Sequence, residues 1–141
     1  MAKLSEDIDP RVTYLVMLNG KEEAQLHDAL ADVIQRKFFS EPEALAAAQR
    51  ALRFLASGGW LEVSLQQAGH ARALSGAELE SIISSPSSWA PPDCAGVPLI
   101  VLAPTDLGVT AWNSGFPILE LSEQARASLM FPQLDSGVSS V

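Results

Sequence analysis

The chain has 141 residues, of which 48% are hydrophobic and 18% are charged, and this length and composition are typical of one globular domain with a single core. Nine Lys and Arg stand against 17 Asp and Glu, and a net charge of −8 disfavours binding to the phosphates of nucleic acids and to anionic lipids. No apolar run has the length of a membrane span and the acidic N-terminus lacks the apolar core of a secretory signal, so we expect a cytoplasmic protein without a membrane partner.

The first predicted element is a helix over residues 11–18, although the same run also has the composition of a strand. Asp9-Pro10 fits the N-cap and first-turn positions of a helix, and Asn19-Gly20 fits its end. Residues 12–18 are rich in β-branched and aromatic side chains, which is the competing signal. The sequence favours the helix and leaves the strand as the alternative.

Two further helices are predicted before residue 57. The second opens at residues 21–23 and has one apolar face, formed by Leu26, Leu30, Val33, Ile34 and Phe38. The third spans residues 41–56, because Ser40 and Glu43 form an S-x-x-E capping box with Pro42 in the first turn. Its apolar residues repeat at helical spacing: Leu45, Ala48, Leu52 and Leu55.

Two strands are predicted in the second half of the chain. Residues 60–66 alternate between apolar and polar side chains, as in a half-buried strand, and residues 97–102 form an apolar run that suits a buried strand. Between them, Ser75 and Glu78 form a second capping box, followed by an irregular loop rich in Ser and Pro over residues 84–96. The helix that this box starts has three apolar residues to bury, Leu79, Ile82 and Ile83.

The last part of the chain contains two similar strand–cap–helix units. The strand at residues 97–102 is followed by Thr105-Asp106, and a run at residues 116–121 is followed by Ser122-Glu123 in the same way. Two copies are too few for a repeat array, so we expect both units within one α+β domain.

The order of these elements resembles the winged helix-turn-helix superfold. A Thr-Asp-x-Gly helix start at residues 105–108 adds to this similarity of architecture, which covers about residues 10–113. The resemblance implies a winged-helix-like α+β fold: three N-terminal helices, a small antiparallel sheet with a helical insertion over residues 67–96, and C-terminal helices. We expect a single domain over residues 1–131 and a flexible tail over residues 132–141.

In a winged-helix protein the third helix would read DNA, but its first turns here carry acids. Glu41 and Glu43 complement the helix dipole, whereas they would repel phosphates. The candidates for nucleic-acid contact are four cations, Arg36, Lys37, Arg50 and Arg53. DNA binding is therefore disfavoured, and a DNA-binding transcriptional regulator is the alternative function, with homodimer formation left open.

The distribution of charge points instead to a protein partner. Residues 1–60 carry seven basic and nine acidic groups, whereas residues 61–141 carry two basic and eight acidic groups. In the second part, Trp89 lies in the Ser/Pro-rich loop, and we expect it to be partly exposed as a binding anchor. Its predicted acidic rim comprises Glu78, Glu80 and Asp93. The pattern favours a protein-binding module with a basic partner, such as an immunity or antitoxin-type protein, and ordinary solubility charge is the alternative explanation.

Neither catalysis nor metal binding has a motif behind it. A Cys–His nucleophile would need Cys94 beside His27 or His70, and no local signature supports that pairing. Asp28 and Asp32 lie four residues apart on a predicted helix, but two carboxylates are too few ligands for a metal site. We therefore expect no enzymatic activity, no metal and no cofactor, and the single cysteine is consistent with a reducing compartment.

Overall fold

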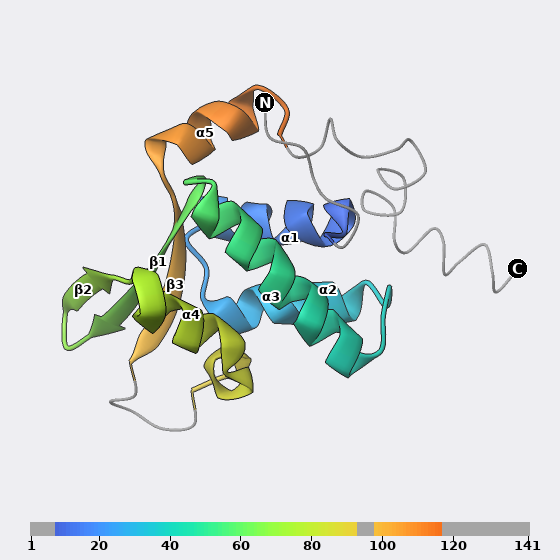
Figure 1. Cartoon of the computed structure of the whole chain (residues 1–141), viewed down its shortest axis with the longest axis horizontal. Helices are drawn as coiled ribbons and strands as arrows, with labels where there is room; N and C mark the ends of the chain where they lie inside the picture. Colours follow the sequence, from blue (N-terminus) through green and yellow to red (C-terminus); the bar gives the residue numbers. More distant parts are fainter. Residues whose placement is uncertain (1–7, 93–97, 117–141) are drawn as a thin grey trace, which may run out of the picture.

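The computed structural model describes residues 8–92 and 98–116 (Figure 1). In chain order these residues form three helices, a β-hairpin, a fourth helix with a short 3-10 helix, a third strand and a fifth helix. The fold is α+β, with three N-terminal helices before a small antiparallel sheet, as the sequence predicted; in this part of the chain the sheet has three strands. None of the described helices is both long and apolar enough to cross a membrane.

The first helix, α1 (Pro10–Lys21), confirms the helical interpretation of the β-rich run. The carboxylate of Asp9 accepts a hydrogen bond from the backbone N–H of Arg11 at 2.8 Å and so caps the helix. The apolar side of α1 is fully buried at Val12, Leu15, Val16 and Met17. Capping and burial therefore outweigh the β propensity of these side chains.

The second helix, α2 (Leu26–Gln35), begins five residues later than predicted. The residues before it contact the sheet instead, because the backbone N–H of Leu102 donates to the carbonyl oxygen of Ala24 at 2.9 Å. Glu23 has a φ of 56°, a conformation that does not continue a helix. The predicted helix start at residues 21–23 is therefore wrong, and Gln25 serves as the N-cap.

The third helix, α3 (Glu41–Ser57), begins at its predicted capping box. The Ser40 hydroxyl donates to the carboxylate of Glu43 at 2.7 Å, and the Ser40 backbone N–H donates to it at 3.3 Å. The bonds from Ser40 lower the pKa of Glu43 below its usual value. The buried residues of α3 are Ala44, Ala47, Ala48, Ala51, Leu52 and Leu55, and they pack against α1, α2 and β1.

The central strand of the sheet is β1 (Leu61–Gln67), and the strand order is β2-β1-β3. β2 (His70–Ala73) pairs with one edge of β1 through a tight turn, and β3 (Leu99–Pro104) pairs with the other edge, where Leu61 lies opposite Pro104. The sequence did not predict β2, because its four residues include no β-branched side chain. The insertion in the sheet therefore begins after β2 rather than at residue 67.

That insertion consists of α4 (Gly76–Ser84) and the 3-10 helix η1 (Pro86–Trp89). The predicted capping box of α4 does not form, because the Ser75 side chain makes no cap hydrogen bond and Glu78 binds Arg72 instead. Of the three apolar residues expected to be buried, Ile83 is buried, and Leu79 and Ile82 are half-buried.

The last described helix is α5 (Asp106–Asn113), and its predicted N-cap is confirmed. The hydroxyl oxygen of Thr105 accepts a hydrogen bond from the backbone N–H of Gly108 at 3.0 Å. The second predicted strand–cap–helix unit lies outside the described residues except for Phe116, and the predicted tail over residues 132–141 lies wholly outside them.

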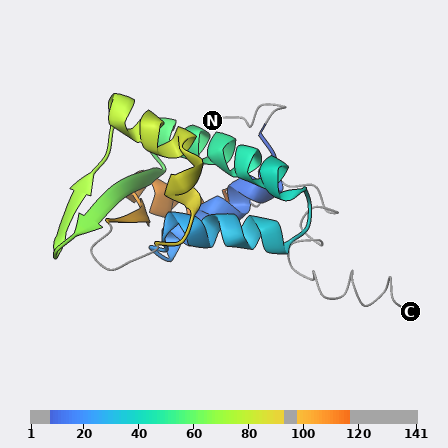
Figure 2. The same cartoon turned by 90° about the horizontal axis from the view of Figure 1, so that it is seen from below.

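One hydrophobic core joins α1, α2 and α3 to the inner side of the sheet. Its largest fully buried side chains include Leu15, Met17, Leu26, Leu52, Leu55 and Leu102. In Figure 2, the β1–β2 hairpin extends away from the helices at one side, and α4 lies beside α3. Ile83 and Trp89 belong to the same core, so α4 and η1 close it over α2 and α3.

Candidate functional site

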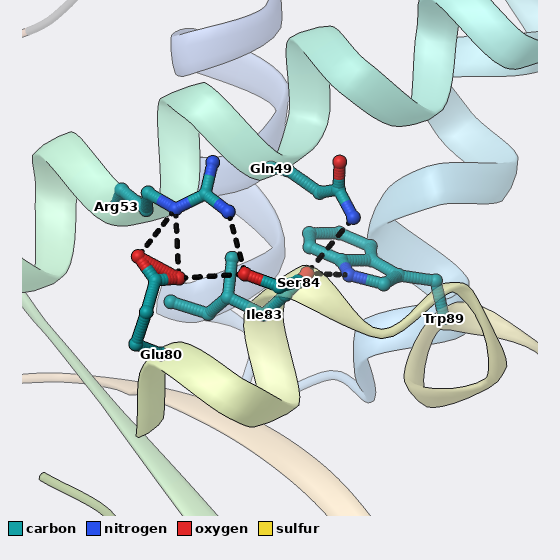
Figure 3. A network of polar contacts seen from close by, with 6 residues as sticks. All are labelled: Gln49, Arg53, Glu80, Ile83, Ser84 and Trp89. Atoms are coloured by element: carbon teal, nitrogen blue, oxygen red, sulfur yellow. Dashed lines mark hydrogen bonds and ion pairs between the residues drawn. The ribbon is translucent and has the colours of Figure 1, made fainter. Parts of the chain in front are cut away.

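Trp89 does not lie where its sequence context predicted. Its side chain is 1% exposed and belongs to the core. The indole Nε1 donates a hydrogen bond to the carbonyl oxygen of Ile83 at 2.9 Å, so the polar edge of the ring is also satisfied (Figure 3). The predicted exposure is wrong, because Pro86 starts a 3-10 turn that brings Trp89 against α2. In this conformation Trp89 anchors η1 and is not a surface contact.

The three acids predicted beside Trp89 have different surroundings. Glu78 accepts two hydrogen bonds from the guanidinium of Arg72, at 2.6 and 2.8 Å, and Glu80 accepts two from Arg53 Nε, at 2.8 and 2.9 Å. These bonds lower the pKa of both carboxyls. Both acids are exposed on α4, so they remain surface residues, but each belongs to an ion pair. Asp93 lies outside the described residues.

A network of polar contacts fastens α4 to α3 (Figure 3). The Nη2 atom of Arg53 donates to the hydroxyl oxygen of Ser84 at 2.8 Å. The Nε2 atom of Gln49 donates to the carbonyl oxygen of Ile83 at 2.9 Å, and the same oxygen accepts the bond from Trp89. The last carbonyls of a helix lack partners inside it, so these two side chains satisfy one of them at the end of α4.

The four cations that were candidates for DNA contact under the alternative function are not gathered at the leading end of α3. Arg36 is the C-cap of α2, Lys37 follows it, and both precede α3. Arg50 lies nine residues beyond the first residue of α3, which corresponds to about 14 Å along the axis. Arg53 is bound to Glu80 and Ser84. The first turn of α3, where a recognition helix meets base edges, carries two exposed acids instead.

Among the described residues, no three side chains of His, Cys, Asp or Glu are placed to hold a metal ion. Asp28 accepts a hydrogen bond from the backbone N–H of Gln25 at 3.1 Å, as part of the cap of α2. Asp32 accepts one from Nδ2 of the buried Asn19 at 2.8 Å and so joins α2 to α1. Both carboxylates have structural roles. Cys94 lies outside the described residues, so its predicted lack of a catalytic partner stays a prediction.

An open groove of about 570 Å³ lies between α3, β1 and α4. Its apolar lining includes Ala56, Leu61, Val63, Leu74 and Leu79, and its charged lining comprises Arg53, Glu62 and Glu80. Arg53 and Glu80 pair with each other, so their charges cancel. Glu62 is exposed and has no ion pair within residues 8–92 and 98–116. We call this site the α3–α4 groove.

At the Thr105 end of the α3–α4 groove, the surface continues onto α5. Leu107 and Val109 are 52% and 44% exposed, and they are the two exposed large apolar residues in the described part of the chain. A Cβ placed on Gly59 would lie 3.7 Å from a methyl carbon of Leu107, so Leu107 covers the turn between α3 and β1. The exposed Asp106 lies between Thr105, which lines the groove, and Leu107, so it is an acid next to the lining in the chain.

Aromatic packing and a close backbone approach hold α5 in place. The ring of Trp60 packs against Phe54 and Phe116, with centroid distances of 5.2 and 4.9 Å. Gly108 lies so near the carbonyl oxygen of Trp60 that a Cβ at this position would collide with it. The Thr105 hydroxyl also donates to the carbonyl oxygen of Gly59. The position of Leu107 relative to the groove is therefore determined by several contacts.

The sequence interpretation missed the α3–α4 groove, because its residues share no motif. They come from the end of α3, from β1, from the end of β2, from α4 and from Thr105, and the fold brings these segments together. Two local signals were available: Glu62 is an acid at an outward position of an alternating strand, and Leu107 is a leucine in the first turn of a short helix.

No family model, no curated protein and no solved structure matches the chain.

Proposed function

We propose that the protein is a non-enzymatic protein-binding module whose partner is basic. The net charge of −8 supports this proposal, and so does the presence of only two cations against eight acids after residue 60. A surface of this charge attracts basic proteins over distances that salt shortens. Neutralisation of a basic effector, as by an immunity or antitoxin-type protein, is one concrete form of this function.

The observation that carries the proposal is the position of α4 on α3. A recognition helix uses side chains such as Gln and Arg to reach base edges and phosphates. Here Gln49 is bound to the carbonyl oxygen of Ile83, and Arg53 is bound to Glu80. The winged-helix-like arrangement is thus proposed as a scaffold in which the side of α3 facing α4 is already occupied.

The experiment compares protein and DNA as ligands of the same purified chain. The immobilised chain is incubated with a lysate of its source cells at low salt and eluted with rising salt, and a labelled duplex from the region upstream of its gene is titrated in parallel. We expect a basic protein to be retained and then released by salt, and no saturable binding of the duplex.

Two results would contradict the proposal. One is the retention of no protein at low salt. The other is saturable duplex binding whose dependence on salt is lost when Arg50→Ala and Arg53→Ala are combined, because that result assigns the phosphate contacts to α3.

A further inference from the structure

We propose that the α3–α4 groove is the docking site for a linear, basic segment of the partner protein, with an apolar side chain of that segment in the groove and Lys or Arg residues beside it. This inference rests on the proposed function and adds to it the surface that binds and the chemistry of what is bound.

The size and lining of the groove suit one or a few apolar side chains. Its volume of about 570 Å³ lies within the range of about 300–1,000 Å³ that is common for binding pockets. Leu61, Val63 and Leu79 contribute apolar lining, and Leu107 extends the apolar surface beyond the Thr105 end. An apolar anchor that fills such a groove gains the free energy of leaving water.

The charges around the groove select for a basic segment. Arg53 and Glu80 cancel each other, whereas Glu62 and Asp106 are exposed acids without an ion pair in the described chain. A Lys or Arg beside the apolar anchor can therefore pair with Glu62 in the lining or with Asp106 next to Thr105, and an acidic segment would be repelled.

The polar groups favour a peptide segment over a small ligand. Small-molecule sites orient their ligands with several convergent polar groups. In this groove Arg53 and Glu80 bind each other, and the Thr105 hydroxyl binds the carbonyl oxygen of Gly59. Every buried side-chain nitrogen or oxygen in the described part of the chain already has a hydrogen-bond partner. Recognition of a ligand at this groove therefore depends on its apolar lining and on the nearby acids.

The test starts with a random peptide library displayed on phage and selected on the intact chain at low salt. An enriched peptide is then synthesised, and its affinity is measured by calorimetry. We expect the enriched peptides to share an apolar residue flanked by Lys or Arg, and we expect the amide NMR signals of Ala56, Leu79 and Leu107 to shift on binding.

Two matched pairs of variants locate the site. Ala73 is exposed and lines the groove, so Ala73→Phe narrows it, whereas Ala71→Phe adds the same ring on the same strand outside the groove. Glu62→Lys and Glu41→Lys change the net charge equally, and Glu41 lies 15 residues from Ala56, about 22 Å along α3. We expect Ala73→Phe and Glu62→Lys each to weaken binding about tenfold, and the two controls to change it less than about twofold.

The inference is overturned if the enriched peptides lack cations, if the shifts map elsewhere, or if each control weakens binding as much as its partner variant. A basic protein captured equally well by wild type, Ala73→Phe and Glu62→Lys would overturn the docking site and leave the proposed function standing. If none of these immobilised chains retains a protein, both the docking site and the proposed function are overturned.

Discussion

Gln49 and Trp89 donate hydrogen bonds to one acceptor, the carbonyl oxygen of Ile83, and each bond is 2.9 Å long. The two donors lie 40 positions apart in the sequence, on α3 and η1, and their shared acceptor lies near the end of α4. This junction holds the helical insertion against α3. It therefore determines both the shape of the α3–α4 groove and the covering of α3.

Replacing the tryptophan tests this junction. Trp89→Ala leaves a cavity in the core and should lower the free energy of unfolding by about 3–5 kcal/mol. Trp89→Phe keeps most of the apolar volume, and Gln49 still donates to the Ile83 carbonyl oxygen. This variant should therefore lower the free energy of unfolding by only about 1–2 kcal/mol. Urea denaturation measures both values. A loss below about 1 kcal/mol for Trp89→Ala would show that the indole is not buried.

The contact between Gly108 and Trp60 gives a second prediction. A methyl group at position 108 would collide with the Trp60 carbonyl oxygen, so Gly108→Ala should displace α5 and cost about 1–3 kcal/mol. Tryptophan fluorescence should change, because Trp60 packs against the segment that moves. In Gly69→Ala the added methyl meets open space, and the strain from its φ of 81° lies in the β1–β2 turn, so this control should leave the emission spectrum unchanged even where it lowers stability. Equal spectra for both variants would refute the close approach.

The ion pair between Arg53 and Glu80 should depend on pH. The pKa of Glu80 lies below its usual value of 4.5, because Arg53 and Ser84 donate hydrogen bonds to the carboxylate. When the pKa of a carboxyl is lower in the folded state than in the unfolded state, its ionised form stabilises the fold at pH values above the unfolded-state pKa. This stabilisation is lost as the pH falls through the lowered folded-state pKa. A double-mutant cycle with Arg53→Met and Glu80→Gln should give a favourable coupling at neutral pH that weakens as the pH falls through the lowered pKa of Glu80. An undiminished coupling in acid would disprove the ionic interaction.

Asp9 should behave similarly at the start of α1. Burial raises the pKa of Asp9, but the hydrogen bonds and charge of Arg11 outweigh burial and lower it below 3.8. Asp9→Ala removes the cap and should cost about 1 kcal/mol at neutral pH, with less loss as the pH falls through the lowered pKa. Asp9→Asn keeps a capping oxygen without the charge, so its stability should depend less on pH. Urea titrations at neutral pH and at a pH below the usual pKa of Asp9 measure these losses. An effect of Asp9→Ala that does not change with pH would contradict the prediction.

The parts of the fold that the sequence predicted correctly depend on local signals. The capping box at Ser40 and Glu43 and the N-caps at Asp9 and Thr105 are each complete within four residues, so the sequence contains all of their partners. The start of α2 was mispredicted because the segment before it pairs with β3, which lies far along the chain. Tertiary contacts there override the local preference.

The candidate site depended on contacts that no local pattern contains. A Ser/Pro-rich context indicated exposure of Trp89, but burial is decided by the packing of η1 on α2. Arg53 and Glu80 are 27 residues apart, and neither has a sequence feature that identifies the other as its partner. The acids of α4 were identified from their charge alone, whereas the groove beside them depends on the packing of segments that are far apart in the sequence.

Quantitative capture with two charge-matched baits decides whether the chain recognises a basic protein through the α3–α4 groove. Wild-type, Glu62→Lys and Glu41→Lys chains are immobilised at equal density and exposed to the same lysate at low and at physiological salt. Recognition through the groove predicts a basic protein whose retention falls about tenfold with Glu62→Lys, stays within about twofold with Glu41→Lys, and decreases as salt rises. Equal retention by all three chains, independent of salt, would contradict it.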